Sequence, residues 1–125
     1  MINIVGRNSV PTYLWVDVDA TWAENLRRKY QEKGLRITLT AILLKAIGIA
    51  QRMHPASRTT ILPWGRTAIL HDIVAGFTVE RFVGSQPAVF FGAIDGVDNK
   101  PVEDIAKELS EYGSNDLESV EHLDV

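Results

Sequence analysis

Apolar and polar residues alternate near the start of the chain, and this pattern predicts a half-buried strand over residues 10–18. Trp22, Leu26 and Tyr30 then recur every four positions, which indicates an amphipathic helix over residues 21–33. Thr21 and Glu24 have the spacing of a capping box at its start, and Gly34 supplies a stop. The two sides of the predicted strand are Tyr13, Trp15 and Asp17, and Leu14, Val16 and Val18.

The stretch Leu39–Met53 is apolar almost all round, so it predicts a central helix that is the most buried element of the fold. This helix begins after Thr38 or Thr40, where a hydroxyl side chain can cap it, and Pro55 ends it.

Strands follow this helix as a group. Short apolar runs at 59–62 and 66–71, on either side of a Pro-Trp-Gly turn, predict a hairpin, and residues 73–80 and 88–94 predict two more strands. A proline at the first helical position opens a last helix over 101–112. Because the strands are grouped and do not alternate with helices, the order favours an α+β layer sandwich with one mainly antiparallel or mixed sheet.

Composition limits the classes of protein that fit. With 125 residues, 46% of them apolar, the chain fits one domain over residues 1–112. It contains no cysteine, which excludes disulfides, thiolate nucleophiles and cysteine metal sites. No segment resembles a signal peptide or a membrane span, so we expect a soluble, cytoplasmic protein without a membrane partner.

Charge separates the body from the tail. All 13 Lys and Arg precede residue 113, and residues 113–125 carry four carboxylates and no cation, which predicts an acidic, disordered tail. The body is nearly neutral, so no nucleic-acid partner is expected. Its tight basic cluster, Arg27, Arg28 and Lys29, is interpreted as a solvated helix face. The three tryptophans, Trp15, Trp22 and Trp64, are interpreted as core or interface residues.

Three segments, in order, resemble the catalytic domain of 2-oxo acid dehydrogenase acyltransferases, which share their fold with chloramphenicol acetyltransferase. The first is the strand, turn and helix of VPTYLWVDVDATWAENLRRKY, and the second is LRITLTAILLKAIGIAQRMHP, with its "LLKA" and closing His-Pro. The third runs from AILHDIVAGFTVE through PAVFFGAIDGVDNKPVEDIAKEL. Together they cover nearly all of residues 10–112, so the resemblance implies a truncated, chloramphenicol acetyltransferase-like layer sandwich.

The resemblance also implies a chemistry. In that family the histidine of a C-terminal H-x-x-x-D-G motif deprotonates a thiol of coenzyme A or dihydrolipoamide, which then attacks a thioester. No segment of this sequence aligns with that motif, so the match implies the front part of the domain only. HDIVAG, from His71 to Gly76, keeps the spacing but has Ala75 in place of the aspartate. The match also implies a homo-oligomer, most simply a trimer, and a coenzyme A or lipoyl group without covalent attachment.

Histidines are the remaining candidates for a general base. His71 is the one that could face a substrate channel, although a structural hydrogen bond at a strand end is the favoured explanation. Asp72 would point to the opposite face if both residues lay on a strand. His54 fits a helix-capping role, and His122 lies in the acidic tail. No set of residues has the spacing of a metal site.

Three functional hypotheses follow. The first is a shortened acyltransferase-like domain that assembles with itself or with a companion acyltransferase chain and has little catalysis of its own. The second is an active acyltransferase that uses coenzyme A or lipoyl thioesters, with His71 as a displaced base. The third is a module that binds acyl-coenzyme A or an acyl carrier.

Overall fold

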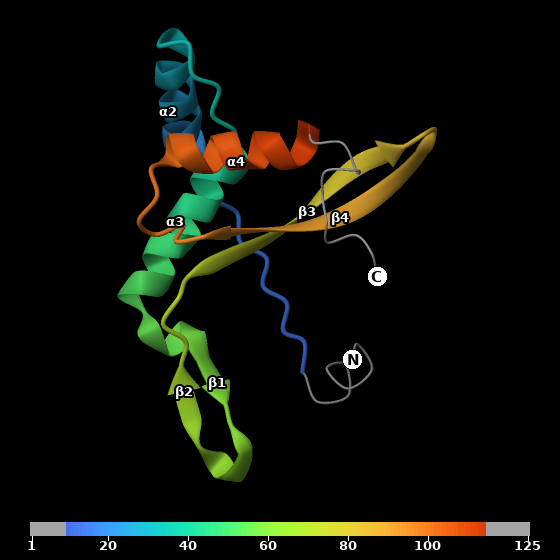
Figure 1. Cartoon of the computed structure of the whole chain (residues 1–125). Helices are drawn as coiled ribbons and strands as arrows, with labels where there is room; N and C mark the ends of the chain where they lie inside the picture. Colours follow the sequence, from blue (N-terminus) through green and yellow to red (C-terminus); the bar gives the residue numbers. More distant parts are fainter. Residues whose placement is uncertain (1–9, 115–125) are drawn as a thin grey trace.

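Residues 10–114 of the computed structural model are described, and they form three α-helices and two antiparallel hairpins (Figure 1). The predicted α+β class is therefore confirmed. The helices are grouped, and the two hairpins extend from them in different directions (Figure 1). The elements are α2 (Thr21–Glu32), α3 (Leu39–Met53), β1 (Thr59–Ile61), β2 (Thr67–Ile69), β3 (Val74–Val83), β4 (Gln86–Asp95) and α4 (Val102–Ser114), with single helical turns at Pro55–Arg58 and Pro63–Gly65.

The strands do not join into one sheet, so the expectation of a single sheet was wrong for this chain. Within residues 10–114, β1 pairs with β2 and β3 pairs with β4, and no strand links the two hairpins. The strand predicted over residues 10–18 is also absent, and every residue of that segment is exposed. A strand needs a neighbour to satisfy its backbone N–H and C=O groups, and the described residues offer this segment none.

Helix ends follow local chemistry. Gly34, at a φ of 79°, ends α2 as predicted, because its N–H donates to Gln31 and the N–H of Leu35 donates to Tyr30. The capping box predicted at the start of α2 was wrong: Ala20 is the N-cap residue, and the Asp19 carboxylate accepts from the N–H of Thr21 at 2.9 Å.

The core lies where α3 and α4 meet the base of β3 and β4. The start of α3, capped as expected by Thr38, contributes to this core, and Gly48 lies so close to the β4–α4 loop that an added Cβ would stand 2.9 Å from the Asp98 nitrogen. The opposite side of α3 is uncovered, with Leu43 59% exposed, so the apolar residues that lie all round this helix are buried on one side only. The core residues are Ile37, Ala41, Ile42, Ile73, Ile94, Val97, Ile105 and Ala106.

The β3–β4 hairpin contacts α4 through one of its faces. The Phe77 ring lies over Gly92, and the ring of Tyr112 meets it edge to face at 5.1 Å between centroids. The Tyr112 hydroxyl donates to the Ala93 carbonyl at 3.1 Å. On the other face, Phe82, Val89 and Phe91 are exposed.

Candidate functional site

The cleft that contains His71 lies between two loops, one joining β2 to β3 and one joining β4 to α4. It has a volume of about 420 Å³, and the N–H of Gly96 donates to the Ile73 carbonyl at 2.9 Å, which ties the two loops together. The cleft is lined by His71, Asp72, Ile73, Asp95, Gly96, Asp98 and Asn99.

His71 lies in a loop and not at a strand end, because β2 stops at Ile69 and β3 starts at Val74. Its ring is fully exposed, and Nδ1 lies 3.4 Å from Oδ1 of Asp72, so the two side chains meet instead of pointing to opposite faces. An exposed contact of this kind adds little to stability, which corrects the expected structural hydrogen bond. Whether His71 can act as a base stays a prediction.

Two cations of α3 bind the β4–α4 loop, which lines one side of the cleft. Lys45 Nζ donates to the carbonyls of Asp98 and Lys100 at 2.7 and 2.6 Å, and Arg52 donates to the Asn99 side chain at 3.2 Å. The Asp98 carboxylate, 9% exposed, lies 3.9 Å from Arg52. Sequence reasoning missed this arrangement, although a lysine in an otherwise apolar helix was the available signal. α3 therefore holds this loop in addition to the loop's own hydrogen bonds, in which the N–H groups of Asn99 and Lys100 donate to the Gly96 carbonyl.

Chemically, the cleft offers an imidazole among carboxylates. Asp72, Asp95 and Asp98 would raise the free energy of a thiolate or an oxyanion placed here. Among the described residues, no hydroxyl side chain lines this cleft. Within residues 10–114, no three His, Asp or Glu side chains are arranged to hold a metal ion. The cleft is therefore better suited to a cation or a neutral group than to an anionic acyl-transfer intermediate.

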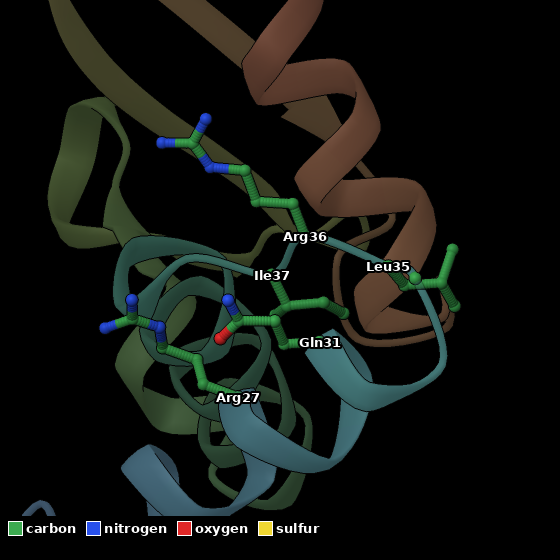
Figure 2. Close-up of a pocket in the computed structure, with 6 residues that line it drawn as sticks. Arg27, Gln31, Leu35, Arg36 and Ile37 are labelled. Carbon is green, nitrogen blue, oxygen red and sulfur yellow. The ribbon is translucent and has the colours of Figure 1, made fainter.

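A second pocket has the opposite charge. It has a volume of about 560 Å³ and lies between α2 and the segment that leads to α3. Figure 2 shows Arg27 and Arg36 with both guanidinium groups on the same side, and Leu35 pointing away from them. The sequence prediction of a solvated basic face holds for Arg28 and Lys29, which are exposed, but it missed the pairing of Arg27 with Arg36 in one pocket. The lining residues are Arg27, Gln31, Gly34, Leu35, Arg36 and Ile37.

Two other histidines, His54 and His122, were candidates in the sequence. His54 is the C-cap residue of α3, but the side chain that contacts a terminal carbonyl of this helix is Arg58, whose Nε donates to Gln51 at 3.3 Å. His122 and most of the predicted acidic tail lie outside the described residues, and α4 continues to Ser114, past the expected boundary.

The three tryptophans, Trp15, Trp22 and Trp64, are all exposed, so none of them belongs to the core of the described part, and their interpretation as interface residues stays a prediction. In the described part, no helix is long and apolar enough to cross a membrane.

Comparison with known proteins identifies the fold. No protein-family model matches the chain, and no curated protein matches it. The crystal structure of a probable dihydrolipoamide acetyltransferase from Listeria monocytogenes 4b F2365 matches with a TM-score of 0.65 and 23% sequence identity. The match covers 87% of this chain and 47% of that chain, so this chain spans about half the length of the solved structure. The resemblance found in the sequence is thus confirmed for the fold, which corresponds to part of an acyltransferase.

Proposed function

We propose that this chain is an acyltransferase-like domain that acts as an assembly or partner subunit, with little catalysis of its own. One observation carries the proposal: three apolar surfaces that a folded domain would normally cover are exposed in the chain. They are the outer face of the β3–β4 hairpin, one side of α3, and the segment 10–18.

These surfaces are extensive. Phe91 of the hairpin is 86% exposed and Leu14 of the N-terminal segment is 85% exposed, and both have apolar neighbours that are exposed as well. Contiguous apolar surface on a soluble protein commonly marks an interface. The hairpin also has unpaired edges, because β3 and β4 pair only with each other in the described part. A second copy or a companion chain would remove both kinds of exposure.

The proposed assembly is a trimer. Rotational symmetry is the usual way in which soluble homo-oligomers close their interfaces, and the resembled acyltransferases form trimers. A companion acyltransferase chain could provide the same cover, and the fold match to about half of a longer chain supports either arrangement.

Light scattering coupled to size-exclusion chromatography tests the proposal. We expect the wild-type chain to elute with the mass of a trimer, and we expect Val89→Thr combined with Phe91→Ser to elute with a smaller mass. Glu80→Gln is the matched control, because Glu80 is exposed beside Val89 on the same hairpin face. A wild-type monomer at every concentration would remove the homo-oligomer from the proposal and leave the companion chain, which co-purification would then have to show.

The absence of strong catalysis rests on the acidic cleft and the exposed His71. One observation favours the alternative, an acyltransferase with a displaced base: the Asp72 carboxylate lies 3.4 Å from the imidazole and could orient it. Incubation with acyl-coenzyme A and a dithiol acceptor separates the two functions. We expect the rate to equal the uncatalysed background, whereas a measurable rate that His71→Asn abolishes without unfolding would favour the alternative.

Thermal unfolding tests whether the chain binds coenzyme A without catalysing a reaction. A ligand that binds only the folded state raises the apparent stability, so a higher melting temperature in coenzyme A would support a binding module. A melting temperature that coenzyme A leaves unchanged is the outcome expected of an assembly subunit.

A further inference from the structure

We propose that the basic pocket of Figure 2 binds the chain's own acidic C-terminal segment, residues 115–125, within the same molecule. This inference goes beyond the proposed function and does not depend on it. It rests on the charge of the two segments, on the chemistry of the pocket, and on the place where α4 ends.

The two segments are the most oppositely charged parts of the chain. Residues 21–37 carry five cations and two carboxylates, a net charge of +3. Residues 115–125 carry four carboxylates and no Lys or Arg, a net charge of −4 with neutral His122. Opposite charges of this size attract one another over roughly the Debye length of about 8 Å at physiological salt.

The pocket has the groups that an acidic peptide needs. Arg27 and Arg36 can each donate two parallel hydrogen bonds to a carboxylate, and no carboxylate of residues 10–114 lines the pocket. Among the ion pairs of residues 10–114, none involves Arg36. Arg27 pairs with Glu24 at 3.3 Å, but both side chains are more than 40% exposed, and such pairs are weak enough to exchange partners.

Apolar contact is available as well. Leu35 is 46% exposed at the edge of the pocket. The acidic segment has Leu117, Val120 and Leu123 between its carboxylates, and one of these could contact Leu35, which points away from the two arginines (Figure 2).

The geometry allows the contact within one molecule. Arg36 lies along α4, because it lines a neighbouring pocket together with α4 residues from Glu103 to Glu111. The helix ends at Ser114, one turn further on, and eleven residues can extend by up to about 36 Å. Glu103 and Asp104 on the α4 side, which line the neighbouring pocket together with Lys107, would repel the segment and favour its approach to Arg27.

Paramagnetic relaxation enhancement tests the proposal on the full chain. The sequence has no cysteine, so Ser119→Cys provides a single site for a spin label. We expect loss of amide signal from Gln31 to Ile37, and recovery of that signal in Arg36→Glu. Arg66→Glu is the matched control, since it reverses one exposed cation in the β1–β2 hairpin, and it should leave the signal loss unchanged. Glu118→Arg with Glu121→Arg should restore the loss in the Arg36→Glu background.

Three results would overturn the proposal. The first is no loss of signal around Arg36 at low salt. The second is a loss that persists in Arg36→Glu, or at 1 M salt, where the Debye length of about 3 Å leaves little attraction between exposed charges. The third is a loss seen when spin-labelled chains are mixed with unlabelled, isotope-enriched chains, because the segment would then bind a second copy. Circular dichroism of each variant shows that the fold is retained.

Discussion

The two faces of the β3–β4 hairpin carry similar residues and have different surroundings. On the inner face, Ile94 is fully buried and Phe77 packs between Gly92 and Tyr112. On the outer face, Val89 and Phe91 are as apolar but mostly exposed. Both faces belong to the same ten-residue strands in one register, so the difference comes from what covers them and not from the strands.

Contacts within residues 10–114 explain the apolar residues on only one of the two faces. α4 and α3 explain why the inner face is apolar, because burial of those side chains stabilises the fold. Nothing within residues 10–114 explains the outer face in the same way. Apolar residues that no other part of residues 10–114 covers are the reason for proposing a second polypeptide.

The largest effect is expected from truncation of a buried side chain on the inner face. Ile94→Ala should lower the free energy of unfolding by about 2–5 kcal/mol, because it removes buried methyl groups and leaves a cavity. Urea unfolding measures this directly. Val89→Ala on the outer face is the matched truncation, and an equally large loss there in the dissociated chain would show that the two faces do not differ.

The two glycines of the hairpin give a finer test, because one lies on each face. An added Cβ at Gly92 would stand 2.5 Å from Cζ of Phe77, whereas at Gly76 it would meet no atom within 4 Å. Gly92→Ala should therefore destabilise the chain by about 1–3 kcal/mol through overpacking. Gly76→Ala should be neutral or slightly stabilising, because alanine has less freedom in the unfolded chain. The reverse order of the two unfolding midpoints would contradict the described packing of Phe77.

A polar substitution on the outer face of the hairpin should change the free energy of unfolding less. Phe91→Ser should change the free energy of unfolding of the dissociated chain by less than about 0.5 kcal/mol, since surface substitutions away from specific contacts have small effects. Unfolding at concentrations low enough to prevent assembly measures it. A large loss would mean that Phe91 contacts part of its own chain.

Much of the fold could be predicted from the sequence, because local signals act within a few residues. Gly34 ends α2, Thr38 caps α3, and the turn between β1 and β2 contains the glycine expected there, Gly65. The class followed from the order of these elements, and the family fold from the resemblance of three segments to the acyltransferases.

Longer-range features could not be predicted in the same way. The alternation of apolar and polar residues at 10–18 predicts a strand, and a strand needs a neighbouring strand. The pattern alone does not show whether that neighbour belongs to the same chain. Lys45 was visible as a cation in an apolar helix, but its bonds to the carbonyls of residues 98 and 100 depend on tertiary structure. The pocket that joins Arg27 and Arg36 likewise depends on how α2 ends.

The smallest effect on stability is expected at Asp19, which lies between the exposed segment 10–18 and α2. Hydrogen bonds from Thr21 lower the pKa of Asp19 below its ordinary value of 3.8, so the charged carboxylate stabilises the start of α2. Because the folded-state pKa is the lower one, this contribution is present above the pKa of the unfolded chain and is lost as the pH falls through the folded-state pKa. Asp19→Asn keeps an acceptor for Thr21 but removes the charge. We therefore expect the variant to unfold more easily than the wild type at neutral pH, and the two to converge in acid below the folded-state pKa of Asp19. Thermal unfolding followed by circular dichroism across this range measures the convergence. A difference that stays constant with pH would show that the Asp19 charge does not stabilise α2, and that the start of this helix depends on the hydrogen bonds alone.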